Sequence, residues 1–164
     1  MALNARGGGG DLLVPSLLDR LSDDEPDRRA EVPFRQSLAA YRASVIRDLQ
    51  DLLNTRHPPP PAGAARSEAG QSLIVYGLPD LSAMNPRSRT DVERLQRAIL
   101  GTLRLFEPRL TRVRVTVEHP ESVMGRIAFR VAADLKIDPR PVPVVFDTVL
   151  DGGRQVFSVQ DRTG

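Results

Sequence analysis

The sequence changes from a helical hydrophobic pattern to a strand pattern over residues 105–110, and this change most constrains the fold. Before it, apolar residues recur at the spacing of one helical face: Val92, Leu95, Ile99, Leu103 and Phe106. Thr90 and Glu93 have the spacing of a capping box, so we predict that a helix of about four turns begins there. Pro108 cannot continue this helix and keeps the preceding residue out of the helical conformation. The helix must therefore end abruptly at residue 107.

Strand patterns follow this proline. Valines alternate with polar residues over residues 111–118, which is the period of a half-buried strand. Similar patterns cover about residues 125–137, 142–150 and 154–160, with short turns between these three. Because short turns join antiparallel neighbours, we predict a C-terminal β-meander with one face packed on amphipathic helices. Helices followed by strands indicate an α+β domain.

An amphipathic helix is also predicted over about residues 36–54. Its apolar positions are Val45, Ile46, Leu49, Leu52 and Leu53. His57 and four consecutive prolines end this helix. The Pro/Ala/Gly-rich residues 57–71 are predicted to form an exposed loop in which His57 is solvated.

A short apolar run over residues 72–81 closes in a glycine and proline turn. We expect Leu78 and Leu81 to lie in the core and Gly77 to permit the turn. Asp80 is expected to cap a local turn or helix.

We divide the chain into two parts. Residues 34–164 are predicted to form a single α+β domain, because the whole chain of 164 residues is long enough for one sizeable core and short for two. Residues 1–33 contain seven acidic residues and four arginines, and their apolar stretch at 12–21 is too short to form a core alone. This stretch either lies on the domain as a strap or docks on a partner, and both alternatives stay open.

Composition argues against several classes of function. The chain has no cysteine and two histidines, so disulfides, thiolate metal sites and histidine-rich metal sites are not expected, nor is a cofactor. No segment approaches the roughly 18 apolar residues of a membrane span, which predicts a cytoplasmic protein without direct membrane insertion. A net charge of +2 and a low aromatic content without a stacking motif do not favour nucleic-acid binding.

Glu107 and Arg109 place an acid and a base at the end of the predicted helix. The best carboxylate pair for catalysis is Glu107 with either Glu118 or Asp80, and glycosidases need two carboxyls about 5 to 10 Å apart beside an open cleft. However, the neighbouring Arg109 favours an ionised carboxylate, whereas a general acid must hold a proton. No nucleophile elbow, phosphate-binding glycine loop or metal-ligand spacing is present, so we predict that the chain is not an enzyme.

Four motifs occur in order along the chain: PSLLDRL at 15–21, the helix end over 44–56, YGLPDL at 76–81 and FEPRL at 106–110. Together with the terminal meander, they resemble the TssE family, the small baseplate subunits of type VI secretion systems. This family is shared with a baseplate wedge protein of contractile-tailed phages and is often labelled lysozyme-like. The resemblance covers nearly the whole chain.

The resemblance implies a structural component of a contractile injection machine that connects the baseplate wedge to the sheath and templates sheath assembly. Its implied partners are the larger wedge subunits TssF, TssG and TssK and the sheath proteins TssB and TssC. The Glu-Pro-Arg motif is the signature of the family. The predicted partner-binding residues are Glu107, Pro108, Arg109 and Leu110 at the corner, and Leu17, Leu18, Arg20 and Leu21 in the front segment.

Two questions stay open on the sequence alone. Glu107 and Arg109 either form an internal ion pair or helix-end cap, or orient a meander edge that accepts a strand from the sheath, and both roles can coexist. The alternative functions are a lysozyme-like peptidoglycan hydrolase and a general adaptor recognised through its first helix or its acidic front segment.

Overall fold

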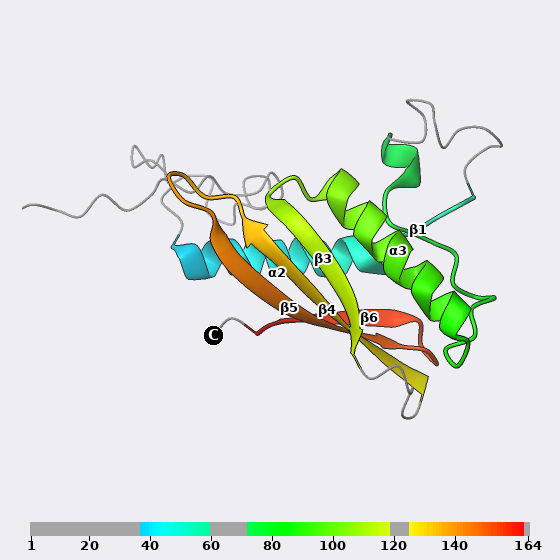
Figure 1. Ribbon diagram of the computed structural model, residues 1–164. Helices are drawn as coiled ribbons and strands as arrows, with labels where there is room; N and C mark the ends of the chain where they lie inside the picture. The colour runs from blue at the N-terminus through cyan, green and yellow to red at the C-terminus, as the bar shows by residue number, and fades with distance from the viewer. Residues whose placement is uncertain (1–36, 60–71, 119–124, 163–164) are drawn as a thin grey trace, which may run out of the picture.

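The computed structural model describes residues 37–59, 72–118 and 125–162, and it has two long helices and one four-stranded sheet (Figure 1). The helices are α2 (Leu38–Asn54) and α3 (Arg89–Phe106). The strands are β3 (Leu110–Glu118), β4 (Arg126–Leu135), β5 (Val142–Asp151) and β6 (Val156–Asp161). They form an antiparallel sheet in sequence order, so the predicted α+β class and C-terminal meander are confirmed.

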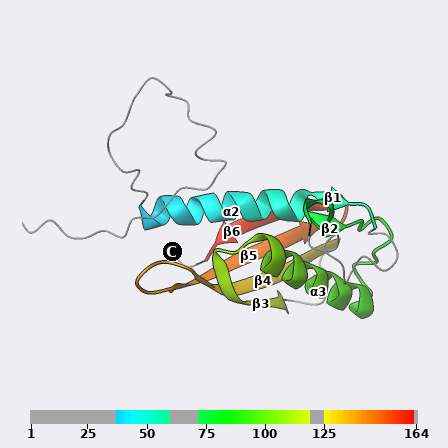
Figure 2. The ribbon, with the colours of Figure 1, turned by 90° about the horizontal axis from the view of Figure 1, so that it is seen from above.

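Both helices pack on one face of this sheet, α2 along β6 and α3 along β3 (Figure 2). The alternation predicted for the longest strand pattern is confirmed: Ile127, Phe129, Val131, Ala133, Leu135 and Ile137 are all buried. From α2, the predicted apolar positions Val45, Leu49, Leu52 and Leu53 are buried against the strands, and Ile46 is partly buried. The core therefore lies between the helix pair and one sheet face.

The start of α3 differs from the prediction. Ser88, not Thr90, is the N-cap: its hydroxyl accepts a hydrogen bond from the Asp91 backbone N–H at 3.3 Å. Glu93 instead pairs with Arg89 at 2.9 Å along the helix surface. Because the helix begins earlier, its 18 residues make about five turns and not four.

The segment after α2 also differs from the prediction. His57, expected in a solvated loop, lies in a short strand, β1 (Arg56–His57), which pairs in parallel with β2 (Leu78–Pro79). A short 3₁₀ helix, η3 (Leu73–Val75), precedes β2. Leu78 and Leu81 are buried in the core, as predicted.

Gly77 joins these short elements to the helices. Its φ of 103° confirms the predicted turn, and an added Cβ would lie 2.4 Å from the Thr55 carbonyl oxygen. The Gly77 carbonyl accepts a hydrogen bond from the Thr102 hydroxyl of α3 at 3.0 Å. Asp80 caps the next turn by accepting the Ser82 backbone N–H at 2.9 Å, also as predicted. Glycine is thus required where the end of α2 meets the β2 connection.

A bulge near the start of β3 aligns this strand with the core. The register shifts between Thr111 and Arg114, and Arg112 has a φ of 53°. Leu110 and Val113, three residues apart, are therefore both buried, although a regular strand would turn them to opposite faces. The bulge separates the exit of α3 from the regular part of β3.

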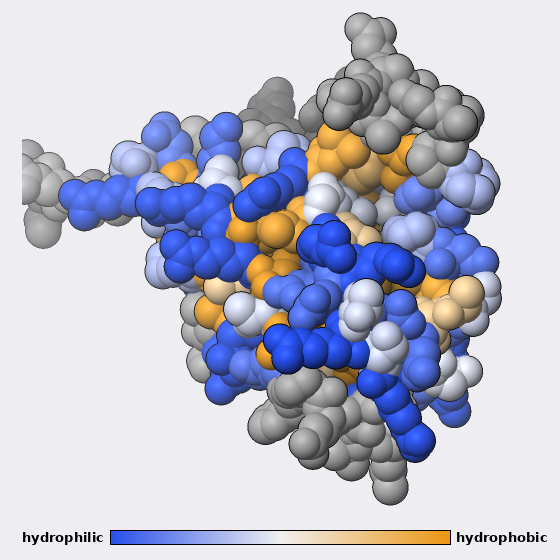
Figure 3. Space-filling view, turned by 45° about the vertical axis from the view of Figure 1, so that its right-hand side comes forward, coloured by the Kyte–Doolittle hydropathy of each residue, from blue (hydrophilic) through white to orange (hydrophobic). Residues whose placement is uncertain are grey.

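The surface is not uniformly polar. Figure 3 shows one face on which hydrophobic patches lie between hydrophilic side chains. The large apolar side chains with the greatest exposure among the described residues are Leu73, Val156, Leu105 and Leu38. Leu105 lies in the last turn of α3, next to the predicted functional corner.

Candidate functional site

The backbone turns sharply where α3 passes into β3. The Glu107 N–H donates to the Leu103 carbonyl at 3.0 Å and closes the last helical turn. The Glu107 carbonyl then accepts the Leu110 N–H at 3.1 Å, while Pro108 is exposed between them. The predicted abrupt helix end at residue 107 is confirmed, with Glu107 as the C-cap.

Arg109 turns back onto the acid that precedes the proline. Its Nε and Nη2 donate to the two Glu107 carboxylate oxygens at 2.6 and 2.5 Å. The Arg109 backbone N–H also donates to Glu107 Oε1 at 3.2 Å. This bidentate arrangement fixes the guanidinium plane, because both of its donors on one side are used. The first and third residues of the Glu-Pro-Arg motif are therefore bonded to each other across the proline.

Helix α2 supplies a second carboxylate to the same guanidinium. Arg109 Nη2 donates to Asp48 Oδ2 at 2.6 Å, and Arg109 Nη1 lies 3.4 Å from the Ser44 hydroxyl. The guanidinium carbon is 5.9 Å from the centre of the Tyr41 ring. We call Asp48, Glu107 and Arg109 the corner cluster; it ties α2, the end of α3 and the start of β3 together.

Sequence reasoning missed the contribution of α2. Asp48 is not one of the apolar positions predicted for its helix, and nothing local connects it to Arg109, which is 61 positions away. The available signal was its spacing from Ser44 and Tyr41, which lie four and seven residues earlier and on the same helical side.

The corner cluster is mostly shielded from water. The side chains of Glu107, Asp48 and Arg109 are 4%, 16% and 20% exposed. Burial alone would lower the pKa of Arg109, but hydrogen bonds and charge from Glu107, and then from Asp48, outweigh it and raise that pKa. Two carboxyl groups thus share one permanently charged guanidinium.

Two tyrosines border the cluster. Burial raises the pKa of Tyr41, with Arg109 opposing and Glu107 adding to the effect. Burial also raises the pKa of Tyr76, and the carboxylates of Asp48, Asp51 and Glu107 raise it further. The Tyr76 ring meets Phe106 edge to face at 5.2 Å between ring centres. The pKa of each phenol therefore depends on how the corner packs.

This corner lies inside a recognisable family region. Residues 39–140, more than half of the chain, match the family model of baseplate wedge protein gp25. The chain belongs to this family. No curated protein and no solved structure matches the chain. The match confirms the resemblance to TssE-like baseplate wedge proteins and supports a structural role in a baseplate, in contact with other baseplate components.

The partner-binding residues predicted for this gp25-family chain differ in exposure. Pro108 is exposed and Arg109 is partly exposed, whereas Glu107 and Leu110 are 4% and 5% exposed. Leu110 packs in the core and Glu107 acts on the surface only through Arg109. Leu17, Leu18, Arg20 and Leu21 lie outside the described residues.

Each carboxylate considered as a partner of Glu107 in hydrolysis has contacts of its own elsewhere. At about 3.3 Å per residue, the length of β3 puts Glu118 roughly 25 Å from the corner. There Glu118 pairs with Arg130 and with Arg162, the latter at 3.8 Å. Asp80 lies on the surface, where the hydrogen bonds from Ser82 lower its pKa. The gp25 family is a structural component of baseplates, and this favours a non-enzymatic role.

Within 37–59, 72–118 and 125–162, no three His, Asp or Glu side chains are grouped in a way that suits a metal ion. In the same ranges, neither helix combines the length and the apolar character needed to cross a membrane.

Proposed function

We propose that this chain is a cytoplasmic baseplate subunit of a type VI secretion system that connects the wedge to the contractile sheath and templates the first sheath ring. The observation that carries the proposal is the corner cluster within the family match: a Glu-Pro-Arg motif locked in one geometry beside an edge strand. A template must hold its docking surface at a fixed angle. The bidentate Glu107–Arg109 pair meets that need, because Asp48 of α2 also holds the guanidinium.

The front segment and the corner have separate partners in this proposal. The front segment, through Leu17, Leu18, Arg20 and Leu21, docks on the larger wedge subunits TssF, TssG and TssK. The corner and the neighbouring sheet edge receive the sheath proteins TssB and TssC. A sheet edge suits this task because its free backbone groups accept a strand without a deep pocket.

Glu107 and Arg109 have different parts in the proposed docking. Glu107 is buried and positions Arg109, while Arg109 exposes one fifth of its side chain and Pro108 is exposed beside it. Leu105, 40% exposed one helical turn earlier than Pro108, adds apolar surface. A partner therefore meets Pro108, the outer edge of the guanidinium and Leu105, and not the carboxylate itself.

Copurification and sheath imaging test the proposal together. The full chain should copurify with TssF and TssG and restore fluorescent sheaths to cells that lack it. Deletion of residues 1–24 should weaken copurification with the wedge subunits while the thermal unfolding midpoint stays nearly unchanged. A large fall in that midpoint would instead show that the front segment belongs to this domain's core.

A hydrolysis assay addresses the enzymatic alternative. Purified protein should release no more peptidoglycan fragments than the Glu107→Gln variant, because the buried carboxylate of Glu107 is engaged by Arg109. Fragment release that depends on Glu107 would contradict a purely structural role.

A further inference from the structure

One side of α3 carries arginines that the rest of the described chain leaves largely unpaired. Arg94, Arg97 and Arg104 are exposed, and their spacings of three and seven residues put them on one side of the helix. Arg94 lies 3.6 Å from a carboxylate oxygen of Asp91, whereas Arg97 donates to the main-chain carbonyl of Glu93 at 3.2 Å. No carboxylate of the described residues pairs with Arg97 or Arg104. We call these three arginines the arginine stripe.

A small hollow lies next to the arginine stripe, between α3 and the loop that follows β2. Its volume is about 170 Å³, and Met84 and Leu95 give it an apolar lining. Three charged residues also line it: Asp80, Asp91 and Arg94. The hollow is smaller than the roughly 300 Å³ of the smallest ligand sites, so it suits one or two apolar side chains.

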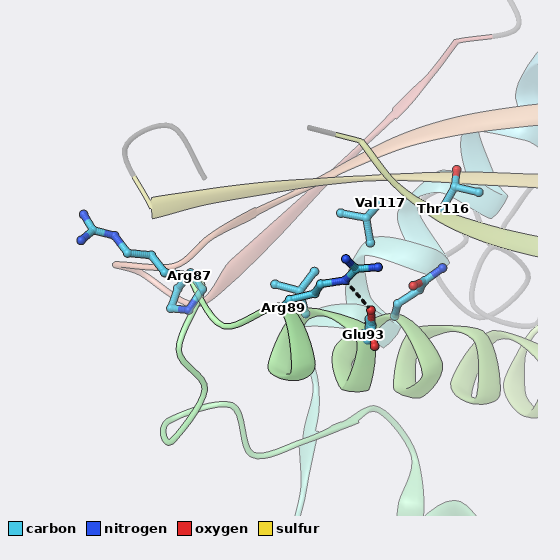
Figure 4. Close-up of a pocket in the computed structure, with 8 residues that line it drawn as sticks. Arg87, Arg89, Glu93, Thr116 and Val117 are labelled. Atoms are coloured by element: carbon cyan, nitrogen blue, oxygen red, sulfur yellow. Dashed lines mark hydrogen bonds and ion pairs between the residues drawn. The ribbon is translucent and has the colours of Figure 1, made fainter. Parts of the chain in front are cut away.

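A larger groove lies on the other side of the arginine stripe, but it suits an acidic segment less well. Its volume is about 550 Å³, and it opens between the first turns of α3 and the end of β3 (Figure 4). Arg89 in this groove already pairs with Glu93 at 2.9 Å (Figure 4). The carboxylate of Glu93 would also repel further acidic side chains.

The front segment, residues 1–33, has side chains that complement the hollow and the arginine stripe in turn. Leucines occur at positions 17, 18 and 21, and four acidic residues follow within 23–27. Arg20 stands among the leucines, as Asp80 stands beside the apolar lining of the hollow. No basic residue interrupts the acidic run. An apolar stretch followed by an acidic run thus matches an apolar hollow followed by arginines.

The connection to α2 allows this match in the correct order. The corner cluster joins Asp48, about 16 Å along α2 from Ser37, to the end of α3. A segment that runs back from Ser37 therefore reaches Arg104 first, and it reaches Arg94 and the hollow roughly 15 Å later. The chain between residue 27 and Ser37 spans up to about 33 Å when it is extended. This length is enough to bring the acidic run to Arg104.

We propose that residues 17–27 lie on α3 in the free subunit, where the leucines fill the hollow and the acidic run pairs with the arginine stripe. Gly101 lies between Arg97 and Arg104, and a Cβ there would meet no described atom within 4 Å, so a covering backbone can approach closely. Because exposed ion pairs add little to folding, this docking agrees with an unfolding midpoint that hardly changes when residues 1–24 are deleted.

This inference goes beyond the proposed function, because it concerns the subunit before assembly. The wedge subunits would take the front segment from α3, so the two contacts of that segment are successive. Covering the leucines in the free subunit also keeps an apolar stretch out of water until the wedge is present.

A spin label on the front segment tests the docking in the full-length protein. The natural chain has no cysteine, so Ser22→Cys carries the label at a single position. In NMR spectra, the amide signals of Ala98 and Gly101 on α3 should lose most of their intensity through the nearby unpaired electron. The signals of Ser158 and Gln160 on β6 should keep theirs. Full intensity at Gly101, or equal losses on α3 and β6, would overturn the proposal.

Charge reversal tests whether the arginine stripe holds the segment. Arg97→Glu with Arg104→Glu should shift the docking equilibrium roughly tenfold toward the free segment and restore the α3 signals, because attraction becomes repulsion at two positions. Arg114→Glu, which changes an exposed arginine of β3, is the matched control and should leave the losses as they are. Signal losses that survive the double reversal, or that Arg114→Glu removes equally well, would overturn the role of the stripe.

A mixing experiment identifies the chain that supplies the segment. Spin-labelled Ser22→Cys without isotope enrichment is mixed with isotope-enriched natural chain, and the α3 signals of the latter should keep their intensity. Signal loss in the mixture would show that a second copy supplies the segment, and it would overturn docking within one chain. Neither a wedge nor a sheath subunit is present in these samples, so failure here leaves the proposed function untouched.

Discussion

Replacing Arg109 with alanine tests whether buried charge holds the corner together. The change removes both hydrogen bonds to the Glu107 carboxylate and the bond to Asp48. Glu107 and Asp48 would then remain as two largely buried carboxylates without their shared cation. The variant therefore loses favourable contacts and also gains an uncompensated buried charge.

The burial of the cluster sets the magnitude. A solvent-exposed pair contributes about 1 kcal/mol or less to folding, whereas breaking a buried pair by removing one partner costs about 3 to 5 kcal/mol. Glu107 is 4% exposed and Arg109 is 20% exposed, so the second range applies. Against a typical stability of about 5 to 15 kcal/mol, the domain should still fold at room temperature. Its unfolding midpoint should fall by roughly 10 to 20 °C.

Urea and thermal unfolding measure this loss, and Arg47→Ala is the matched control. Arg47 lies on α2 with its Nε 3.8 Å from Asp48 Oδ1, but its side chain is 51% exposed. Removing it should cost no more than about 1 kcal/mol. Adding Glu107→Gln to Arg109→Ala should recover part of the loss, because one unpaired charge is removed. If Arg109→Ala costs no more than Arg47→Ala, the reasoning from burial is refuted.

Two further predictions use the same unfolding assays. Gly77→Ala should lower the free energy of unfolding by at least about 2 kcal/mol, because the φ of Gly77 is 103° and the new Cβ would meet the Thr55 carbonyl. Gly101→Ala is the control: Gly101 lies on α3 with open space around it, so the change should raise the free energy of unfolding by up to about 1 kcal/mol. Burial raises the pKa of Tyr41 and Tyr76 in the folded protein above the ordinary value of 10. The stability that the two tyrosines contribute is therefore fully present below pH 10, and it is lost as the pH rises above 10 and through their raised pKa. Tyrosinate absorbance follows both groups directly because the chain has no tryptophan, and ionisation at the ordinary pH with no loss of stability would contradict their burial.

Local patterns predicted the elements whose causes are local. The end of α3 at residue 107 followed from Pro108, which acts on its immediate neighbour wherever the chain folds. The alternation of β4 followed from a period of two, and Phe129 and Val131 are each 1% exposed. The predicted start of α3 was wrong because Ser88 and Asp91 have the same spacing as Thr90 and Glu93. The extended backbone of Ser88 decides between them, and sequence does not give it.

Contacts between distant segments could not be predicted in this way. Asn54 and Phe157 are 103 positions apart, and their pairing depends on how α2 lies along β6. Asp48 joins the corner for the same reason. A polar residue beside an apolar helical stripe is usually solvated, so its spacing alone does not distinguish a surface carboxylate from one that clamps an arginine. The motif identified the corner, and the packing of α2 completed it.

Reversing the charges tests whether the corner contains a pair or a cluster of three. In a simple pair, Glu107→Arg with Arg109→Glu would keep the attraction. Here the new carboxylate at position 109 would face Asp48, whose Oδ2 now accepts from Arg109 at 2.6 Å. We therefore expect the double variant to lose about 3 to 5 kcal/mol, as Arg109→Ala does, and to recover part of it when Asp48→Asn is added. A charge-reversed variant with the natural urea midpoint would show that Asp48 does not constrain the corner. Since the reversal disturbs folding, its effect on sheath assembly must be compared with that of Arg109→Ala at equal amounts of folded protein.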